Sequence, residues 1–361
     1  MMKLVIIVGT RPEIIQSSVL IHQLTKENWL AFQVWNTGQH YNYEMSEIFQ
    51  EELNVCLDRN FGVGSGSSME QLAKIMVETE KALIEYRPDL MVVFGDTNST
   101  LGAAIAAKKL NIPIAHVESG PREQIYDGKN FHRDRAMNSY PEEANRIIVD
   151  ICSEILFAPT KDSVRNLKME YVLGDIVFVG DIGQEILLKN LPLISKSGDY
   201  NLVTLHRAEN TDNLIRLKEI VTALVESKTP IIFPIHPRTR KAMDESGLIN
   251  LLIKNTLIHV CEPVSYREML KLMLGAKYIL TDSGGVQREA FYLKVPCLTL
   301  RNNTGWVETV QCGANKLIEP KDIANELNKI SSFPSQINPI FGDGKTSLKI
   351  VKHIKKWWLS K

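Results

Sequence analysis

The sequence predicts an α/β protein of two domains, each built on a parallel β-sheet. Short runs of apolar and β-branched residues recur along the 361-residue chain, and each is followed by a turn and a segment of helical periodicity. These runs are apolar throughout rather than alternating, which is typical of strands covered by helices on both faces. The length suits two domains that each bury a core of their own.

The first set of strands lies in the N-terminal half. The predicted strands are residues 4–8, Leu90–Phe94 and Ile114–Val117. The predicted helices are residues 69–86 and 101–109. Pro12, just after the first strand, suits the first turn of a helix.

A second set of buried strands follows Gly180, with predicted limits 202–205, Ile231–Pro234, 257–260, 278–281 and 297–300. Periodicity weakens and glycines accumulate over residues 161–200, so the domain boundary belongs there. We assign 1–168 with 346–361 to the first domain and 169–345 to the second. The amphipathic segment 347–359 predicts a terminal helix, either a cap on the second domain or a helix that packs back across the junction.

Composition excludes several classes of protein. Forty-two Lys and Arg balance forty-two Asp and Glu, so no overall field attracts nucleic acid or a membrane surface. No apolar run approaches the roughly 18 residues that a transmembrane helix needs, and the N-terminal run is too short for a secretory signal. The five cysteines form no CxxC pair and indicate reduced thiols. We expect a cytoplasmic protein that meets any anionic ligand with local groups.

Polar residues follow the predicted strands of the first half, at the edge where ligands bind in parallel sheets. Arg11 opens a helix, where it either contacts an anion or points to solvent. Asp96 either faces a ligand or caps the next helix. His116 and Glu118 share one face if the segment is extended, but no third ligand has metal-site spacing, so we expect no metal. Glu142 opens a helix, where a carboxylate also suits the helix dipole.

The second half carries the stronger signal. His206 and His236 each end a buried strand, where a histidine is costly in a core and useful in a cleft. Ser283, Gly284 and Gly285 form a strand-to-helix turn whose N–H groups can approach a phosphate, although the turn is also a common connection. Glu289, about a turn inside that helix, can accept hydrogen bonds from ribose hydroxyls.

Other cofactor and nucleophile motifs are missing from the sequence. No Gly-x-Gly-x-x-Gly follows a buried strand, so NAD(P) is unsupported. There is neither a Walker lysine loop nor a Gly-x-Ser-x-Gly elbow. We therefore expect no cofactor.

Taken in order, these segments resemble the non-hydrolysing UDP-N-acetylglucosamine 2-epimerase family. Each matching stretch is short, but their ordered combination over some 300 residues is highly specific. The stretches are residues 9–13, 37–40, 95–98, 116–120, 141–146, 205–210, 236–238, 262–263 and 282–289.

The resemblance implies the glycosyltransferase-B architecture, with two Rossmann-like domains facing across a cleft and a terminal helix that returns to the first. It also implies a homodimer that interconverts UDP-GlcNAc and UDP-ManNAc without cofactor or metal, through loss of UDP to a bound glycal and its re-addition. On the matching positions, Asp96, Glu118 and Glu142 are the catalytic carboxylates and His206 faces the diphosphate. The implied substrate-binding positions are Arg11, His236, Ser283, Gly284, Gly285 and Glu289.

Three departures from the family pattern bear on the substrate. Gln16 stands where a lysine is common, which removes a positive charge. Gly120-Pro121-Arg122 replaces Gly-Leu-Arg and leads into a longer segment through residues 131–135, which should lie over the sugar. Trp306 stands where the family has an arginine that meets the nucleotide, and it could stack or close the cleft instead.

Four alternatives stay open. The chain could epimerise another UDP-2-acetamido sugar of 6-deoxy or uronic-acid type, or it could be a hydrolysing epimerase that releases free ManNAc. It could also be a glycosyltransferase of the same fold, against which the three carboxylates argue. A non-catalytic nucleotide-sugar sensor would bind UDP without exchanging the C2 proton.

Overall fold

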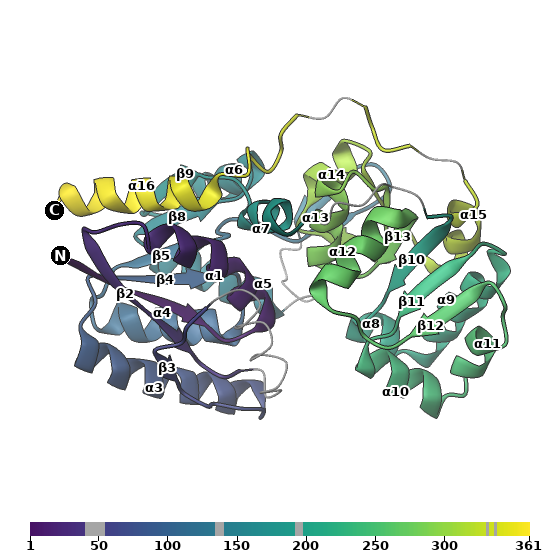
Figure 1. The fold of residues 1–361 in the computed structure, drawn as a ribbon, viewed down its shortest axis with the longest axis horizontal. Coiled ribbons are helices and arrows are strands. Elements are labelled where there is room, and N and C mark those ends of the chain that lie inside the picture. The colour runs from purple at the N-terminus through teal and green to yellow at the C-terminus, as the bar shows by residue number, and fades with distance from the viewer. Residues whose placement is uncertain (40–54, 134–140, 192–197, 330–331, 336–337) are drawn as a thin grey trace. The chain divides into compact units, whose positions relative to one another are not determined.

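The computed structural model describes residues 1–39, 55–133, 141–191, 198–329, 332–335 and 338–361. The chain divides into two compact units (Figure 1), and each is treated by itself. The first comprises Met1–Arg122, Asp134–Ile186 and Pro339–Lys361, and the second Glu123–Arg133 and Leu187–Asn338. The limits 168/169 and 345/346 proposed from the sequence remain predictions.

The first unit contains a seven-stranded parallel sheet in the order β3-β2-β1-β4-β5-β8-β9. Its strands are β1 (Met2–Val8), β2 (Leu30–Asn36), β3 (Arg59–Asn60), β4 (Leu90–Phe94), β5 (Ile114–Val117), β8 (Ile155–Ala158) and β9 (Asp175–Phe178). The strand order reverses between β1 and β4, which makes this edge the expected ligand-binding position of a Rossmann-like sheet.

Helices cover both faces of this sheet (Figure 1). Helix α7 (Ile182–Asn190) runs from the first unit into the second, where Leu187 joins an apolar cluster. The helices of the first unit are α1 (Arg11–Leu24), α3 (Ser68–Tyr86), α4 (Asn98–Lys109), α5 (Pro141–Cys152), α6 (Lys161–Met169) and α16 (Thr346–Leu359). The last of these lies beside α1, and Trp357 Nε1 donates to Glu154 Oε1 over 3.1 Å. The terminal helix therefore returns to the first unit, as predicted.

The absence of a side chain at Gly102 lets α3 and α4 lie close together. A Cβ on Gly102, in the middle of α4, would stand 2.6 Å from Ile75 Cγ2 of α3. Glycine weakens a helix interior, but here it admits the fully buried Ile75 side chain. This contact fixes α4, and with it the loop between β4 and α4.

The second unit repeats the design with a six-stranded parallel sheet in the order β12-β11-β10-β13-β14-β16. Its strands are β10 (Tyr200–Thr204), β11 (Ile231–Pro234), β12 (Ile258–Cys261), β13 (Ala276–Thr281), β14 (Cys297–Thr299) and β16 (Asn315–Leu317). This is the Rossmann order, with its reversal between β10 and β13. The predicted α/β class, with parallel sheets in two units, is confirmed.

Two apolar layers sandwich this second sheet. Its helices are α8 (Ala208–Thr211), α9 (Leu214–Glu226), α10 (Pro237–Glu245), α11 (Ile249–Ile253), α12 (Tyr266–Gly275), α13 (Gly284–Tyr292), α14 (Val307–Gln311), η1 (Pro320–Asp322) and α15 (Ile323–Leu327). One layer gathers buried residues of α9, α11 and α15, and the other those of α12 and α13.

A small antiparallel sheet, not predicted from the sequence, also belongs to the second unit. It has the order β15-β6-β7, from β6 (Gln124–Tyr126), β7 (Phe131–Arg133) and β15 (Asn303–Thr304). Among the described residues, no helix is long and apolar enough to cross a membrane.

Candidate active site

The β1–α1 and β4–α4 loops of the first unit are joined by a buried carboxylate, Glu13. Its Oε2 accepts from the backbone N–H groups of Gly9, at 2.7 Å, and Thr10, at 2.9 Å. Its Oε1 accepts from Thr97 Oγ1 at 2.5 Å and from Thr100 Oγ1 at 3.1 Å. Burial raises the pKa of Glu13 to about 7, and these hydrogen bonds oppose the rise. The sequence placed Glu13 in a motif but did not single it out.

Asp96 lies in the second of these loops and does not cap the following helix. Thr97 is the N-cap of α4, and its hydroxyl accepts from Thr100 N at 3.3 Å. The Asp96 carboxylate instead pairs with the buried Arg146 of α5, and its backbone carbonyl accepts from Asn145 Nδ2 at 2.9 Å. Because Thr97 supplies the cap, the Asp96 carboxylate is not used for capping, and its partner is Arg146.

Glu118 follows β5 and is held by the first helix. Gln16 Nε2 of α1 donates to Glu118 Oε2 over 2.8 Å, and both side chains are buried. Glu118 has a φ of 70°, in the left-handed region that non-glycine residues rarely adopt. The extended geometry that would place His116 and Glu118 on one face therefore ends at Val117. The neutral amide that replaces the family lysine binds this carboxylate directly.

His116 belongs to a buried network rather than to a metal pair. Its Nε2 lies 2.7 Å from the Gly95 carbonyl oxygen and its Nδ1 2.7 Å from Asp150 Oδ1. Burial acts to raise the pKa of Asp150, but His116 and Arg122 outweigh it and hold the pKa below its ordinary value. Each ring nitrogen of His116 therefore faces an acceptor, a backbone carbonyl on one side and a carboxylate on the other.

The same carboxylate orients the segment after Glu118. Asp150 Oδ2 accepts from Gly120 N at 3.2 Å and from Arg122 Nη2 at 2.6 Å. Arg122 also donates to both carboxylate oxygens of Glu170, over 2.9 and 2.6 Å. A single buried aspartate of α5 thus supports the loops that carry Asp96 and Glu118.

Glu142 and Arg11 open α5 and α1, and both are partly buried. Their helices also supply Arg146, which contacts Asp96, and Gln16, which contacts Glu118. Hydrogen bonds and ion pairs therefore link the elements that carry the four residues predicted in the first unit. These residues are Arg11, Asp96, Glu118 and Glu142, and their elements meet at one sheet edge.

In the second unit, Asp282 organises the end of β10. It accepts from the backbone N–H groups of His206 and Arg207 and from Asn210 Nδ2, over 3.0 to 3.1 Å. Burial acts to raise the pKa of Asp282, but the His206 side chain first, and then Asn210 and the Arg207 backbone N–H, hold it below its ordinary value. His206 Nδ1 lies 3.2 Å from Asp282 Oδ1, so the second ring nitrogen, Nε2, is the atom available to a ligand.

His236 lies beside His206, with 5.6 Å between the ring centroids. It caps α10, and its Nδ1 accepts from Arg238 N at 3.2 Å. Burial, and then the neighbouring His206, lower the pKa of His236 below its ordinary value. The structure brings the two predicted histidines together.

The turn after β13 is open around its glycines. Ser283 caps α13 by accepting from Val286 N at 3.4 Å. A Cβ on Gly284 would meet only Trp306 Nε1, at 3.5 Å, and one on Gly285 only Ser283 Oγ, at 3.8 Å. Neither contact is a clash, so the fold itself does not require glycine at either position. The Arg288 guanidinium lies 4.3 Å from the centroid of the Trp306 ring. Glu289 lies about one helical turn after Gly285 in α13.

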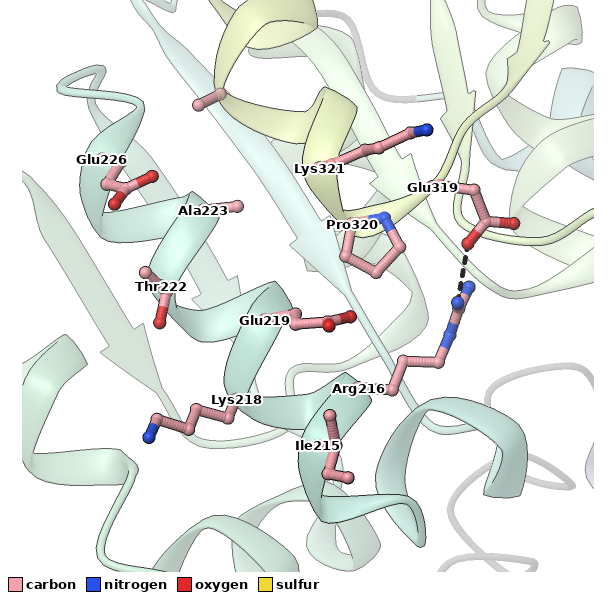
Figure 2. A pocket seen from close by; sticks show the side chains of 11 residues that line it. Ile215, Arg216, Lys218, Glu219, Thr222, Ala223, Glu226, Glu319, Pro320 and Lys321 are labelled. Atoms are coloured by element: carbon pink, nitrogen blue, oxygen red, sulfur yellow. Dashed lines mark hydrogen bonds and ion pairs between the residues drawn. The ribbon is translucent and has the colours of Figure 1, made fainter.

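A separate groove of the second unit lies between α9 and the η1–α15 segment. The Arg216–Glu319 ion pair, at 2.7 Å, lies at one end of it (Figure 2). None of the predicted site residues lines this groove. Among the described residues, no group of three or more His, Cys, Asp or Glu side chains is arranged to hold a metal.

Comparisons with known proteins show which family the chain belongs to. A family model described as UDP-N-acetylglucosamine 2-epimerase matches residues 22–355. A UDP-N-acetylglucosamine 2-epimerase of Methanocaldococcus jannaschii is 44% identical across 97% of this chain and 98% of its own length. A UDP-2,3-diacetamido-2,3-dideoxy-D-glucuronate 2-epimerase of Pseudomonas aeruginosa is 38% identical across 98% of this chain and 100% of its own.

Among solved structures, the Methanocaldococcus jannaschii UDP-GlcNAc 2-epimerase in complex with UDP-GlcNAc and UDP superposes with a TM-score of 0.86. It is 43% identical and covers 98% of this chain and 100% of its own. The fold and the family match define a nucleotide-sugar isomerase built from two Rossmann-like units, as in the glycosyltransferase-B fold. The chain belongs to the UDP-N-acetylglucosamine 2-epimerase family.

Proposed function

We propose that this protein interconverts UDP-GlcNAc and UDP-ManNAc by eliminating UDP and adding it back. A carboxylate accepts the C2 proton, the C2–H electron pair becomes the C1=C2 double bond of the glycal, and UDP leaves with the C1–O pair. Re-addition with protonation on the opposite face inverts C2. The C2 proton is weakly acidic, so charge stabilisation at C1 and on departing UDP has to supply much of the rate.

Within this proposal the first domain acts on the sugar and the second binds UDP. Asp96, Glu118 and Glu142 carry the proton and favour positive charge at C1. His206, oriented by Asp282, stabilises the departing diphosphate together with Arg11.

The nucleotide contacts come from the second domain. Ser283, Gly284 and Gly285 bind phosphate, supported by the open space around both glycines. Glu289 and His236 complete the nucleotide contacts. The roles of all these residues are carried over from the family pattern.

The observation that carries the proposal is the pair of carboxylates at the switch point, Asp96 held by Arg146 and Glu118 held by Gln16. Incubation with UDP-GlcNAc in D₂O tests it, with proton NMR to follow loss of the C2 signal. We expect wild-type protein to incorporate deuterium and to form the UDP-ManNAc anomeric signal.

Asp96→Asn and Glu118→Gln should each slow incorporation at least about 100-fold, as expected for loss of acid–base catalysis. The matched control is Glu85→Gln, because Glu85 is 68% exposed and pairs with Arg59 at the surface of the first unit. Unchanged circular dichroism excludes unfolding as the cause. Deuterium incorporation at the wild-type rate in both site variants would contradict the proposed roles.

A second candidate substrate is a UDP-2-acetamido uronate, because the Pseudomonas aeruginosa relative is a UDP-diacetamido-glucuronate epimerase. The altered segment after Glu118 adds basic residues, of which His132 pairs with Asp127 over 2.6 Å. Asp134 and Arg135 lie outside the described residues. If the protein epimerised the UDP-2-acetamido uronate and did not epimerise UDP-GlcNAc, the uronate would be the substrate.

We further propose that the enzyme works in the cytoplasm as a homodimer without cofactor. The five cysteines are all free thiols, which suits a reducing compartment. Light scattering coupled to size exclusion measures the oligomeric state directly, and dialysis against a chelator should leave activity unchanged.

A further inference from the structure

The antiparallel hairpin of residues 123–133 connects the two proposed halves of the active site through the chain itself. It groups with the second unit, although residues on both sides of it in the sequence belong to the first. Strand β6 pairs with β15 in the register Ile125↔Asn303, and Tyr126 N donates to the Asn302 carbonyl over 2.9 Å.

The hairpin is internally well ordered. Asp127 at its turn accepts from the backbone N–H groups of Lys129, at 2.8 Å, and Asn130, at 2.7 Å. The rings of Tyr126 and Phe131 lie 4.9 Å apart across the two strands. The hairpin can therefore move as one element with β15.

On the nucleotide side, the hairpin connects to the helix that carries the glycine turn. Thr304 of β15 donates from Oγ1 to Gln287 Oε1 of α13 over 2.8 Å, and both residues are buried. Arg301, which is 2% exposed, lies 3.0 Å from Glu209 Oε1 and 3.7 Å from Glu123 Oε2. A charge pair and a buried hydrogen bond thus bind β6 and β15 to the proposed UDP-binding elements.

On the sugar side, the chain is anchored directly before the hairpin. Arg122 is 1% exposed and pairs with Asp150 and Glu170. Gly120 has a φ of +88°, and a Cβ there would stand 2.5 Å from the Ser163 carbonyl oxygen. The five residue steps from Glu118 to Glu123 span at most about 18 Å. This short covalent connection is the route by which a shift of the hairpin would reach the loop that carries Glu118.

We propose that the 123–133 hairpin couples occupancy of the Gly284–Gly285 turn to the placement of Glu118, with Glu123 and Thr304 as positioning residues. Bound UDP fixes α13, Thr304 transmits this to β15 and β6, and the anchored segment 118–122 aligns the carboxylate. This inference rests on the proposed function, since it assigns UDP to α13 and proton transfer to Glu118. Neither positioning residue touches the reacting atoms.

Two conservative variants test the coupling. Glu123→Gln removes the charge but leaves Arg301 its closer partner, Glu209. Thr304→Val keeps the side-chain shape, and Gln287 Oε1 still accepts from Asn315 Nδ2 at 3.3 Å. Lys129→Ala, at the exposed hairpin tip, is the matched control.

For each protein we measure the UDP Kd by calorimetry, kcat for C2 deuterium exchange, and amide hydrogen exchange of residues 118–122 with and without UDP. In wild type and Lys129→Ala, UDP should protect this segment. In Glu123→Gln and Thr304→Val, UDP-dependent protection should disappear and kcat should fall about 10- to 100-fold through misplacement of Glu118. The UDP Kd should rise only by the factor by which UDP stabilises the segment in wild type, as linkage requires.

The outcomes separate the two proposals. Wild-type kcat and protection in both variants would overturn the coupling, as would an active wild-type enzyme whose 118–122 segment is unaffected by UDP. An inactive wild-type protein in which UDP still protects residues 118–122 through the hairpin would support the connection and refute the proposed reaction. A merely structural role predicts a loss of UDP affinity well beyond that linkage factor, together with loss of catalysis, and this result also contradicts the coupling.

Discussion

At the scale of single residues, Glu13 is the least expected member of the site. It is fully buried, yet it satisfies two backbone N–H groups and two threonine hydroxyls from adjacent loops. The sequence shows only an acidic residue in the first turn of a helix, which usually means a favourable helix dipole. Its other partners lie more than 80 residues away, so only the fold reveals that Glu13 joins the loops carrying Arg11 and Asp96.

The raised pKa of Glu13 predicts a pH-dependent contribution to stability. The folded pKa is about 7 against an ordinary 4.5, so folding favours the protonated acid. Its stabilisation is complete below about pH 4.5 and is lost as the pH rises to 7, by about 3 kcal/mol.

Glu13→Gln mimics the protonated acid, because its amide oxygen can accept from Gly9 and Thr10 while its NH₂ faces the two hydroxyls. Urea unfolding should show that the variant gains stability relative to wild type between pH 4.5 and 7, and that the difference is constant above. A difference that does not depend on pH would contradict the assignment.

At the scale of elements, α16 returns to the first unit and should contribute to its stability. Ile354 is fully buried on the inner face of this helix, whereas Leu359 at its end is 75% exposed. Ile354→Ala should therefore lower the free energy of unfolding by about 2 to 4 kcal/mol. Leu359→Ala, a comparable truncation in the same helix, should change it by less than about 0.5 kcal/mol. Equal effects in denaturant melts would show that α16 is not docked through its apolar face.

The same scale shows what the sequence can predict. Strands β4, β5 and β11 match their expected limits to the residue, because wholly apolar runs bounded by turns carry a clear signal. The β6–β7 hairpin and β15 were missed because three- and two-residue strands have no periodicity. Asp96 and Glu118 were found as strand-end carboxylates, but their partners Arg146 and Gln16 lie 50 and 102 residues away. Those contacts depend on topology, which no local pattern encodes.

At the scale of the molecule, the chain has zero net charge, so the proposed anionic ligand has to be met by local groups. Buried charges in the first unit are neutralised in place, as in the chain His116–Asp150–Arg122–Glu170. In the second unit the open glycine turn, rather than a cluster of lysines, meets the proposed diphosphate. In the proposed function, binding and chemistry depend on different residues in different units, so single substitutions should separate them.

Gly284→Ala tests this division. The added Cβ would meet only Trp306 Nε1, at 3.5 Å, so the free energy of unfolding should change by less than about 1 kcal/mol. The same methyl group would occupy the space of a phosphate, so the UDP Kd should rise at least about tenfold, or 1.4 kcal/mol.

Gly66→Ala is the matched control, since that glycine has an ordinary φ and its nearest neighbour, Glu70 Oε2, is 3.4 Å from the added Cβ. Glu118→Gln should show the reverse pattern, with an unchanged UDP Kd and lost C2 exchange. If Gly284→Ala bound UDP as tightly as wild type, the diphosphate would have to bind elsewhere, and the assignment of the nucleotide to α13 would fall even with the carboxylates in place.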